Sequence, residues 1–201
     1  MKPVNRRVFL RMTCAVVSGA SLIAMPLQAL AQSMQNPDAA KVLAEIDKAT
    51  FIPQGKGKRL LYVFIDANCP YCHELFIALG PRAGKNGLQV RWVPVAVLAP
   101  SSVTKAAAIL QAKDRLAALR ENELNYGKGP TGQGGGIAPA KDVLPATSAI
   151  LNANNALLEA TKSPGVPTML YRDKQGNAML VVGPPDARQL NHILASVGNP
   201  G

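Results

Sequence analysis

A short apolar segment followed closely by two cysteines constrains this chain more than any other feature. Residues 60–65 read Leu-Leu-Tyr-Val-Phe-Ile, with no charged side chain among them. Such a run is typical of a strand that is buried on both faces of a sheet. Both faces of that sheet must then be covered by helices, which predicts an α/β fold.

The residues that follow place a cysteine at the start of a helix. The predicted strand ends near Asp66, and the sequence C-P-Y-C-H occupies residues 69–73. Proline is favoured at the first helical position, where its missing N–H group costs no hydrogen bond. Apolar side chains then recur at helical spacing, at Leu75, Phe76 and Leu79.

The cysteine pair does not serve stability. The chain has three cysteines, and Cys14 lies in an N-terminal segment that we expect to be removed. A bridge between Cys69 and Cys72 would close too small a loop to restrict the unfolded chain much. Their spacing admits three chemistries: a redox dithiol, half of a metal site, or the C-x-x-C-H signal for covalent haem attachment.

The surroundings favour the redox dithiol. A zinc site needs four ligands, and beyond the pair the chain offers only His73 and the distant His192. Haem attachment would use His73 and a distal methionine such as Met169 or Met179, but it does not need the buried strand before the motif. We therefore expect no metal and no cofactor other than the cysteine pair itself.

The predicted helix start assigns different roles to the two thiols. Backbone N–H groups and the positive end of the helix dipole lower the pKa of a thiol at this position, so Cys69 is expected to be the nucleophile. Cys72, one turn later, is expected to be the shielded, resolving thiol. Pro70 and Tyr71 would tune the reduction potential, while His73 could donate to the thiolate or have no role.

The N-terminus predicts export to the periplasm. Residues 1–31 combine a cationic start, an apolar middle and Ala-Leu-Ala at 29–31, which together are typical of a cleaved signal peptide. The paired Arg6 and Arg7 match a twin-arginine signal, with an ordinary secretory signal as the alternative. The apolar stretch is too short and too rich in Gly and Ser for a spanning helix.

The amino-acid composition of the chain limits the classes of molecule that it is expected to bind. Lys and Arg number 22 against 12 Asp and Glu, giving a net charge of +10, and only 4% of the residues are aromatic. The cations are scattered along the chain without interleaved aromatic residues. This pattern argues against nucleic-acid binding.

The order of elements predicts a thioredoxin fold with a helical insertion between the CxxC half and a later, proline-containing half. Residues 32–58 are interpreted as a helix at 39–48, capped by Asp38, and a linker from residue 53. Residues 59–201 are interpreted as one domain, with the insertion at about 101–162.

The remaining elements follow from apolar spacing and turn residues. Ser101 or Ser102 is predicted to cap a helix, and the Gly-rich segment 127–136 is expected to be a mobile connection, because no G-K-[ST] follows it. Further strands are predicted at 88–98, 168–172 and 178–182, and helices at 115–124, 145–160 and from Asp186 to Gly198.

Three segments also carry a family resemblance. They are C-P-Y-C at 69–72 after a strand ending in Asp66, V-P-V-A-V at 93–97 leading into A-A-A-I-L at 106–110, and G-V-P-T at 165–168 before a hairpin. Together they resemble the catalytic domain of the periplasmic thiol:disulfide interchange proteins DsbC and DsbG, and DsbG more closely.

The resemblance implies an activity and a second part of the site. It implies a thiol-disulfide oxidoreductase that acts on protein disulfides or oxidised protein thiols of exported proteins. It also implies a cis peptide bond before Pro167 beside the cysteines, with Val166, Pro167 and Thr168 forming a loop that pairs with an extended client segment.

Two departures from the family affect what can be carried over. Val166 stands where DsbC and DsbG have Thr, as in DsbA-type oxidases, so the redox partner could be a DsbD-type reductase or a DsbB-type oxidase. Residues 32–58 are too few for the dimerisation domain of the family, which predicts a monomer. A redox-inactive binding module that uses the groove near Pro167 is a further alternative.

Overall fold

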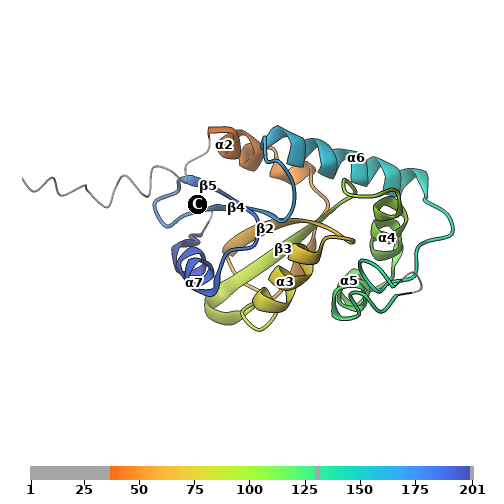
Figure 1. Ribbon diagram of the computed structural model, residues 1–201. Helices are drawn as coiled ribbons and strands as arrows, with labels where there is room; N and C mark the ends of the chain where they lie inside the picture. Colours follow the sequence, from red (N-terminus) through yellow and green to blue (C-terminus); the bar gives the residue numbers. More distant parts are fainter. Residues whose placement is uncertain (1–36, 130–131, 200–201) are drawn as a thin grey trace, which may run out of the picture.

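A five-stranded sheet with helices on both faces forms the centre of the molecule (Figure 1). The computed structural model describes residues 37–129 and 132–199, so the predicted signal peptide lies outside the described residues. The strand order is β1-β3-β2-β4-β5; β2 and β3 run parallel, and the other neighbouring pairs are antiparallel. The strands are β1 (Ile52–Gln54), β2 (Arg59–Asp66), β3 (Leu88–Val95), β4 (Thr168–Arg172) and β5 (Ala178–Val182).

Strand β2 is buried on both faces, as its unbroken apolar sequence predicts. Leu61, Val63 and Ile65 join a core with α3 (Pro70–Leu79) and α7 (Ala187–Ser196). The alternate residues Tyr62 and Phe64 join a second core on the opposite face. That second core is closed by α2 (Pro37–Ala44) and α6 (Pro145–Ala160).

The helical insertion lies between β3 and β4. It consists of α4 (Pro100–Gln111), α5 (Arg115–Leu124) and α6, and α4 packs against both of the others. Helix α5 also packs against α3, so the insertion borders the helix that begins at the cysteine pair. In Figure 1, α4 and α5 lie at the end of the molecule away from the labelled C-terminus.

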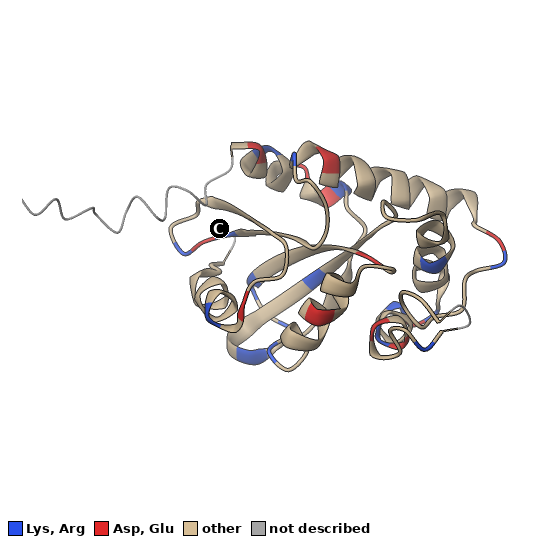
Figure 2. Cartoon of the chain, viewed as in Figure 1, with Lys and Arg blue, Asp and Glu red and all other residues tan. Residues whose placement is uncertain are grey.

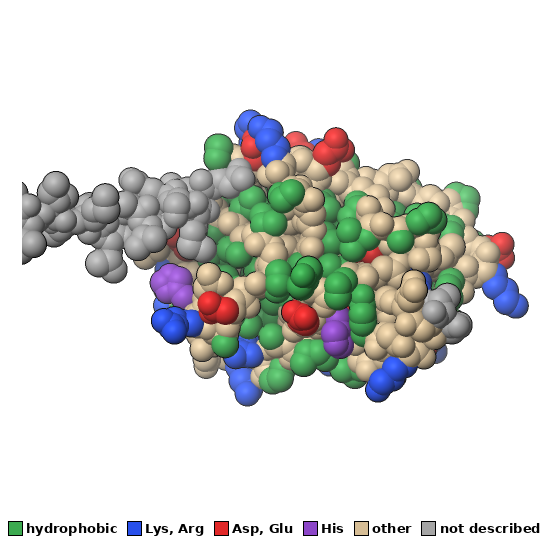
Figure 3. Space-filling model, viewed as in Figure 1, with side chains coloured by type: hydrophobic (Ala, Val, Ile, Leu, Met, Phe, Trp, Pro, Cys, Tyr) green, Lys and Arg blue, Asp and Glu red, His purple; other side chains and the backbone are tan. Residues whose placement is uncertain are grey.

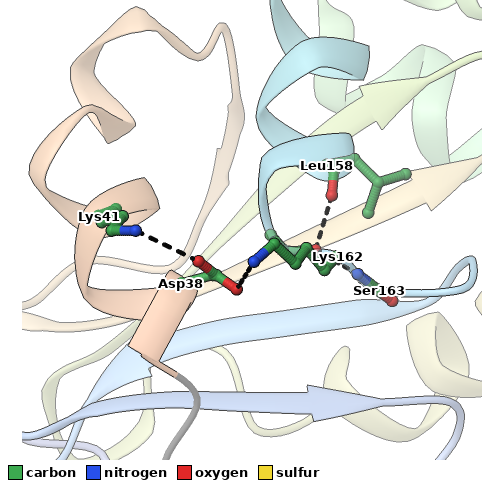
Figure 4. A network of polar contacts seen from close by, with 6 residues as sticks. Asp38, Lys41, Leu158, Lys162 and Ser163 are labelled. Carbon is green, nitrogen blue, oxygen red and sulfur yellow. Dashed lines mark hydrogen bonds and ion pairs between the residues drawn. The ribbon is translucent and has the colours of Figure 1, made fainter.

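The first helix differs from the prediction. It begins at Pro37 and ends at Ala44, and a short 3-10 helix, η1 (Ile46–Lys48), follows it. Asp38 is therefore in the first turn instead of capping the helix. Figure 4 shows its carboxylate between Lys162, at 2.8 Å, and Lys41, at 3.6 Å. The hydrogen bond from Lys162 is the main cause that lowers the pKa of Asp38, and the pair connects α2 to the end of α6.

The predicted linker contains a strand that the sequence reading missed. Residues 52–54 pair with β3 as the short edge strand β1, where Pro53 is tolerated because an edge strand does not use every N–H group. Ile52 and Gln54 face inward, and the Trp92 indole donates a 2.8 Å hydrogen bond to Oε1 of Gln54. The linker proper therefore begins only after Gln54.

The start of α4 also corrects the prediction. Its N-cap is Ala99, and neither Ser101 nor Ser102 occupies that position. Ser102 instead lies in the first turn, where its hydroxyl accepts a hydrogen bond from the Ala99 N–H at 3.2 Å and donates to Oδ1 of Asp66 at 2.7 Å. The serine thus connects the helix start to the end of β2.

Charged side chains lie on many separate elements (Figure 2). Lys and Arg are found on helices, strands and the short 3-10 helix η2 (Lys85–Gly87) before β3. Within residues 37–129 and 132–199, no helix combines the length and the apolar character that a bilayer crossing requires.

Candidate active site

Cys69 is the N-cap of α3, as the sequence predicts. Its N–H group donates to the carbonyl of Asp66 at 3.0 Å, and Pro70 is the first residue of the helix. The backbone N–H of Cys72 points back to Sγ of Cys69 at 3.3 Å. The pKa of the Cys69 thiol is lowered, mainly by a hydrogen bond from the Cys72 side chain and further by the N–H groups of Cys72 and Tyr71.

The second thiol lies in a different environment. Cys72 is fully buried, and burial raises its pKa, with its contact to Cys69 as the next cause. The two cysteines are unbridged in this structure. A thiol with a lowered pKa therefore lies next to one with a raised pKa, which is the arrangement expected of an attacking and a resolving cysteine.

The loop before β4 lies beside Cys69. The Val166-Pro167 bond is cis, as the family resemblance implies, and the carbonyl oxygen of Val166 is 3.6 Å from Sγ of Cys69. Thr168 is fully buried, and its hydroxyl is 2.6 Å from both the Gly165 carbonyl and the Ser163 hydroxyl. Thr168 thus holds the loop in shape from within.

The side chains of Tyr71 and His73 lie in different environments. Tyr71 is 54% exposed in the first turn of α3. The His73 ring stacks on Tyr126 from the segment after α5, with a centroid distance of 5.0 Å and an interplanar angle of 22°. Nδ1 of His73 is buried and, within the described part of the chain, has no hydrogen-bond partner.

Asp66 organises the end of β2. Its fully buried carboxylate accepts hydrogen bonds from the N–H groups of Val97 and Leu98 through Oδ2, and from the Asn68 N–H and the Ser102 hydroxyl through Oδ1. Because the amides of residues 97 and 98 turn toward Asp66, β3 ends at Val95 and not at residue 98 as predicted.

The Gly-rich segment borders the site instead of forming a free connection. The Gly135 N–H donates to the Ala67 carbonyl at 2.9 Å. The Lys105 amine, on a residue only 2% exposed, donates to the carbonyls of Gly135 and Gln133 and to Oδ1 of Asn68. The described part of this segment thus lies against the two residues that precede Cys69.

Two polar residues of α5 complete the surroundings of the site. Asn122 and Glu123 are 0% and 1% exposed, and Nδ2 of Asn122 lies 3.1 Å from both the Ala67 carbonyl and Oε1 of Glu123. Burial raises the pKa of Glu123 to about 8. The sequence reading did not single out these residues, although they continue the helical spacing of the buried Ala118 and Leu119.

The candidate ligands for a haem or zinc site, apart from the cysteines, lie on four different elements. Met169 and Met179 lie on β4 and β5 within the apolar core. His192 is exposed on α7, whereas His73 stacks on Tyr126. In the ranges 37–129 and 132–199, no group of three His, Cys, Asp or Glu side chains is arranged to hold a metal ion.

Comparison with known proteins agrees with this architecture. A thiol:disulfide interchange protein DsbG from Pseudomonas aeruginosa is 28% identical over 178 residues, covering 88% of this chain and 66% of that protein. The DsbG of Escherichia coli is 30% identical over 137 residues, covering 68% of this chain and 53% of that protein. The chain thus spans from about half to just under two thirds of the length of these relatives.

Solved structures show the same fold. Proteus mirabilis ScsC in a compact conformation superposes with a TM-score of 0.61 at 21% identity, covering 85% of each chain. The predicted thioredoxin fold with a helical insertion is therefore confirmed. The family model for a thioredoxin-like domain matches residues 46–198, which is most of the sequence. The chain accordingly belongs to the family of proteins with a thioredoxin-like domain.

Proposed function

We propose that this chain is a DsbG-like thiol-disulfide oxidoreductase that acts on protein disulfides or oxidised protein thiols in the periplasm. The observation that carries the proposal is the placement of Cys69 as the N-cap of α3, with the Cys72 N–H on its sulfur and a lowered pKa. A lowered pKa increases the fraction of the Cys69 side chain that is present as the nucleophilic thiolate. The similarity to two DsbG proteins supports the same activity.

The geometry supports a two-step exchange. The Cys69 thiolate attacks one sulfur of a client disulfide, which forms a mixed disulfide and releases the other client sulfur as a thiolate. Cys72 then loses its proton and attacks Sγ of Cys69, so that the Cys69–Cys72 bond forms and the second client sulfur leaves. Two electrons pass from the cysteine pair to the client, and no other cofactor takes part.

Exposed apolar side chains around the cysteines suit a protein client. Tyr71 lies in the first turn of α3, and Leu98, whose N–H binds Asp66, is 50% exposed after β3. Val97, on the same connection, is 46% exposed, and Val103, on α4, is 38% exposed. Figure 3 shows apolar side chains gathered over the centre of this face. An extended client segment would lie along the loop of Val166 and Pro167.

The redox partner, the oligomeric state and the export route belong to the same proposal. A DsbD-type membrane reductase would keep the pair reduced, or a DsbB-type oxidase would keep it oxidised. The protein would be exported by a cleaved signal peptide and act as a monomer. The redox state of Cys69 and Cys72 in cells distinguishes the two partners, and sedimentation of the mature protein measures the oligomeric state.

A trapping experiment tests the activity itself. Cys72→Ser should accumulate mixed disulfides between Cys69 and periplasmic proteins, because the second step is blocked. The double variant Cys69→Ser, Cys72→Ser is the matched control and should trap none. If Cys72→Ser traps no more protein than the double variant, the proposed exchange chemistry is wrong.

A further inference from the structure

Unpaired buried polar atoms gather where α3 packs against α5. Among the described residues, the buried side-chain atoms without a hydrogen-bond partner are Nδ1 of His73, Oδ1 of Asn122 and Oε2 of Glu123. His73 directly follows Cys72 on α3, and the other two lie on α5. Buried polar atoms are nearly always paired, so three exceptions beside a thiol pair indicate a chemical role for this contact.

The proposed exchange needs a base beside Cys72. Attack on the mixed disulfide requires the Cys72 thiolate, but this side chain is fully buried and burial raises its pKa. The thiol must therefore give its proton to a nearby group as it attacks. Asp66 and Glu123 are the buried carboxyl groups of this region, and the charge of Glu123 further raises the pKa of Cys72.

Hydrogen bonding distinguishes these two carboxyl groups. Each oxygen of Asp66 accepts two hydrogen bonds. Oδ2 accepts from the N–H groups of Val97 and Leu98, and Oδ1 accepts from the Asn68 N–H and the Ser102 hydroxyl. Glu123 accepts one hydrogen bond, from Asn122 to Oε1 at 3.1 Å, and its Oε2 is the unpaired atom. Glu123 therefore has a free lone pair for a proton, whereas Asp66 does not.

We infer that Glu123 is the proton acceptor for Cys72 when the mixed disulfide is resolved. This inference rests on the proposed exchange activity. The Glu123 carboxylate takes the proton of the Cys72 thiol, directly or across one water molecule, and the new thiolate attacks Sγ of Cys69. The Cys69–Cys72 bond forms, the bond from Cys69 to the client breaks, and the client thiolate takes a proton from water.

The charge on Cys69 controls when the Glu123 carboxylate becomes available for this step. Burial is the main cause that raises the pKa of Glu123, and the Cys69 thiolate raises it further. Once Cys69 is bonded to a client its negative charge is gone, so the pKa of Glu123 falls and the carboxylate forms more readily. The base thus becomes available at the stage of the reaction that uses it.

Other titratable groups surround Glu123 and act on the same equilibrium. They are Asp66 from β2, Cys69, Cys72 and His73 from α3, Lys105 from α4, and Tyr126 after α5.

The two exchange steps can be followed separately with dithiobisnitrobenzoate, an aromatic disulfide that releases a coloured thiolate at each step. The first release depends on reagent concentration and reports attack by Cys69, whereas the second does not and reports attack by Cys72. In Glu123→Gln we expect a first step within about two-fold of the unmodified protein and a second step about a hundred-fold slower at neutral pH. Glu121→Gln removes an exposed carboxylate of the same helix and should change neither step.

The pH profile distinguishes proton transfer from a structural effect. The second step should rise with pH and level off as Glu123 ionises, whereas in Glu123→Gln it should rise without a plateau. Equal second-step rates and equal profiles in the two proteins would overturn the role of Glu123 and leave the exchange activity standing. If the unmodified protein shows no second release at all, the proposed function itself fails.

A spectroscopic measurement tests the inference without changing Glu123. In Cys72→Ser, methyl methanethiosulfonate caps Cys69 as an uncharged methyl disulfide, and infrared spectroscopy follows the protonated carboxyl group of Glu123 through a pH titration. The pKa should be lower with Cys69 capped than with Cys69 as a free thiolate. An unchanged or higher value in the capped protein would contradict the inference.

Discussion

The amine of Lys105 lies 2.9 Å from Oδ1 of Asn68 and 2.7 Å from the carbonyl oxygen of Gly135. A single buried cation therefore joins the residue before Cys69 to the Gly-rich segment of the insertion. The hydroxyl of Tyr126 also donates to the Asn68 carbonyl, at 2.8 Å. These contacts fix the backbone that leads into Cys69.

Lys105→Met should destabilise the protein. The variant leaves the carbonyls of Gln133 and Gly135 and Oδ1 of Asn68 without their donor, which costs roughly 2–3 kcal/mol of unfolding free energy. Denaturant unfolding measures the change. The exposed Lys113→Met should stay within about 0.5 kcal/mol of the unmodified protein. Equal stability of the two variants would show that the Lys105 contacts contribute little.

Gly135→Ala should displace the Gly-rich segment from the site. A Cβ atom at this position would lie 2.0 Å from Oδ1 of Asn122, closer than real Cβ contacts allow. The expected loss is about 2 kcal/mol of unfolding free energy, with weaker amide protection in residues 132–136 by hydrogen exchange. Gly132→Ala is the matched control, because its site is open and only its φ of +64° opposes a side chain, at a cost of about 1 kcal/mol. A smaller loss at Gly135 than at Gly132 would contradict the described packing.

Glu123 should make stability fall as pH rises. Its folded pKa of about 8 lies above the ordinary value of 4.5, so the folded state holds a proton that the unfolded state has lost between these values. Unfolding free energy should therefore decrease with pH across this window, by at most about 1.4 kcal/mol per pH unit. The lowered pKa of Cys69 acts in the opposite direction, so the comparison uses the double variant Cys69→Ser, Cys72→Ser.

In the double variant the folded pKa of Glu123 should be lower than in the unmodified protein, because the charge of Cys69 is one cause of its raised value. Stability should then stop falling at a lower pH. Adding Glu123→Gln should abolish the slope and give the more stable protein at the alkaline end. Thermal unfolding at a series of pH values measures both. A slope that persists in the Gln variant would assign the effect to another group.

Local sequence was sufficient to predict the half of the site on α3. The apolar strand, the proline after Cys69 and the spacing of the following apolar residues act over short distances. Helices 115–124 and 145–160 and strands 168–172 and 178–182 were also predicted at their observed bounds, because each has clear periodicity and flanking turn or capping residues.

The parts that the sequence reading missed depend on tertiary packing. Strand β1 is three residues long and contains a proline, so only its pairing with β3 identifies it. The role of Lys105 depends on a carbonyl 30 residues away in the chain. The sequence did hold a signal for Asn122 and Glu123, because both lie on the apolar face of α5, where polar side chains are unusual. Their closeness to the cysteines follows only from the packing of α5 on α3.

The pKa of the Cys69 thiol tests the central claim most directly. The rate of alkylation by iodoacetamide, measured against pH in Cys72→Ser and in the unmodified protein, reports the fraction of Cys69 present as thiolate. In the unmodified protein we expect the midpoint below the ordinary value of 9.0, with Cys72 left unmodified, and a lowered midpoint in Cys72→Ser as well, because the serine hydroxyl can donate the hydrogen bond that the Cys72 thiol gives. A midpoint at or above 9.0 in the unmodified protein, or equal alkylation of both cysteines, would contradict the account.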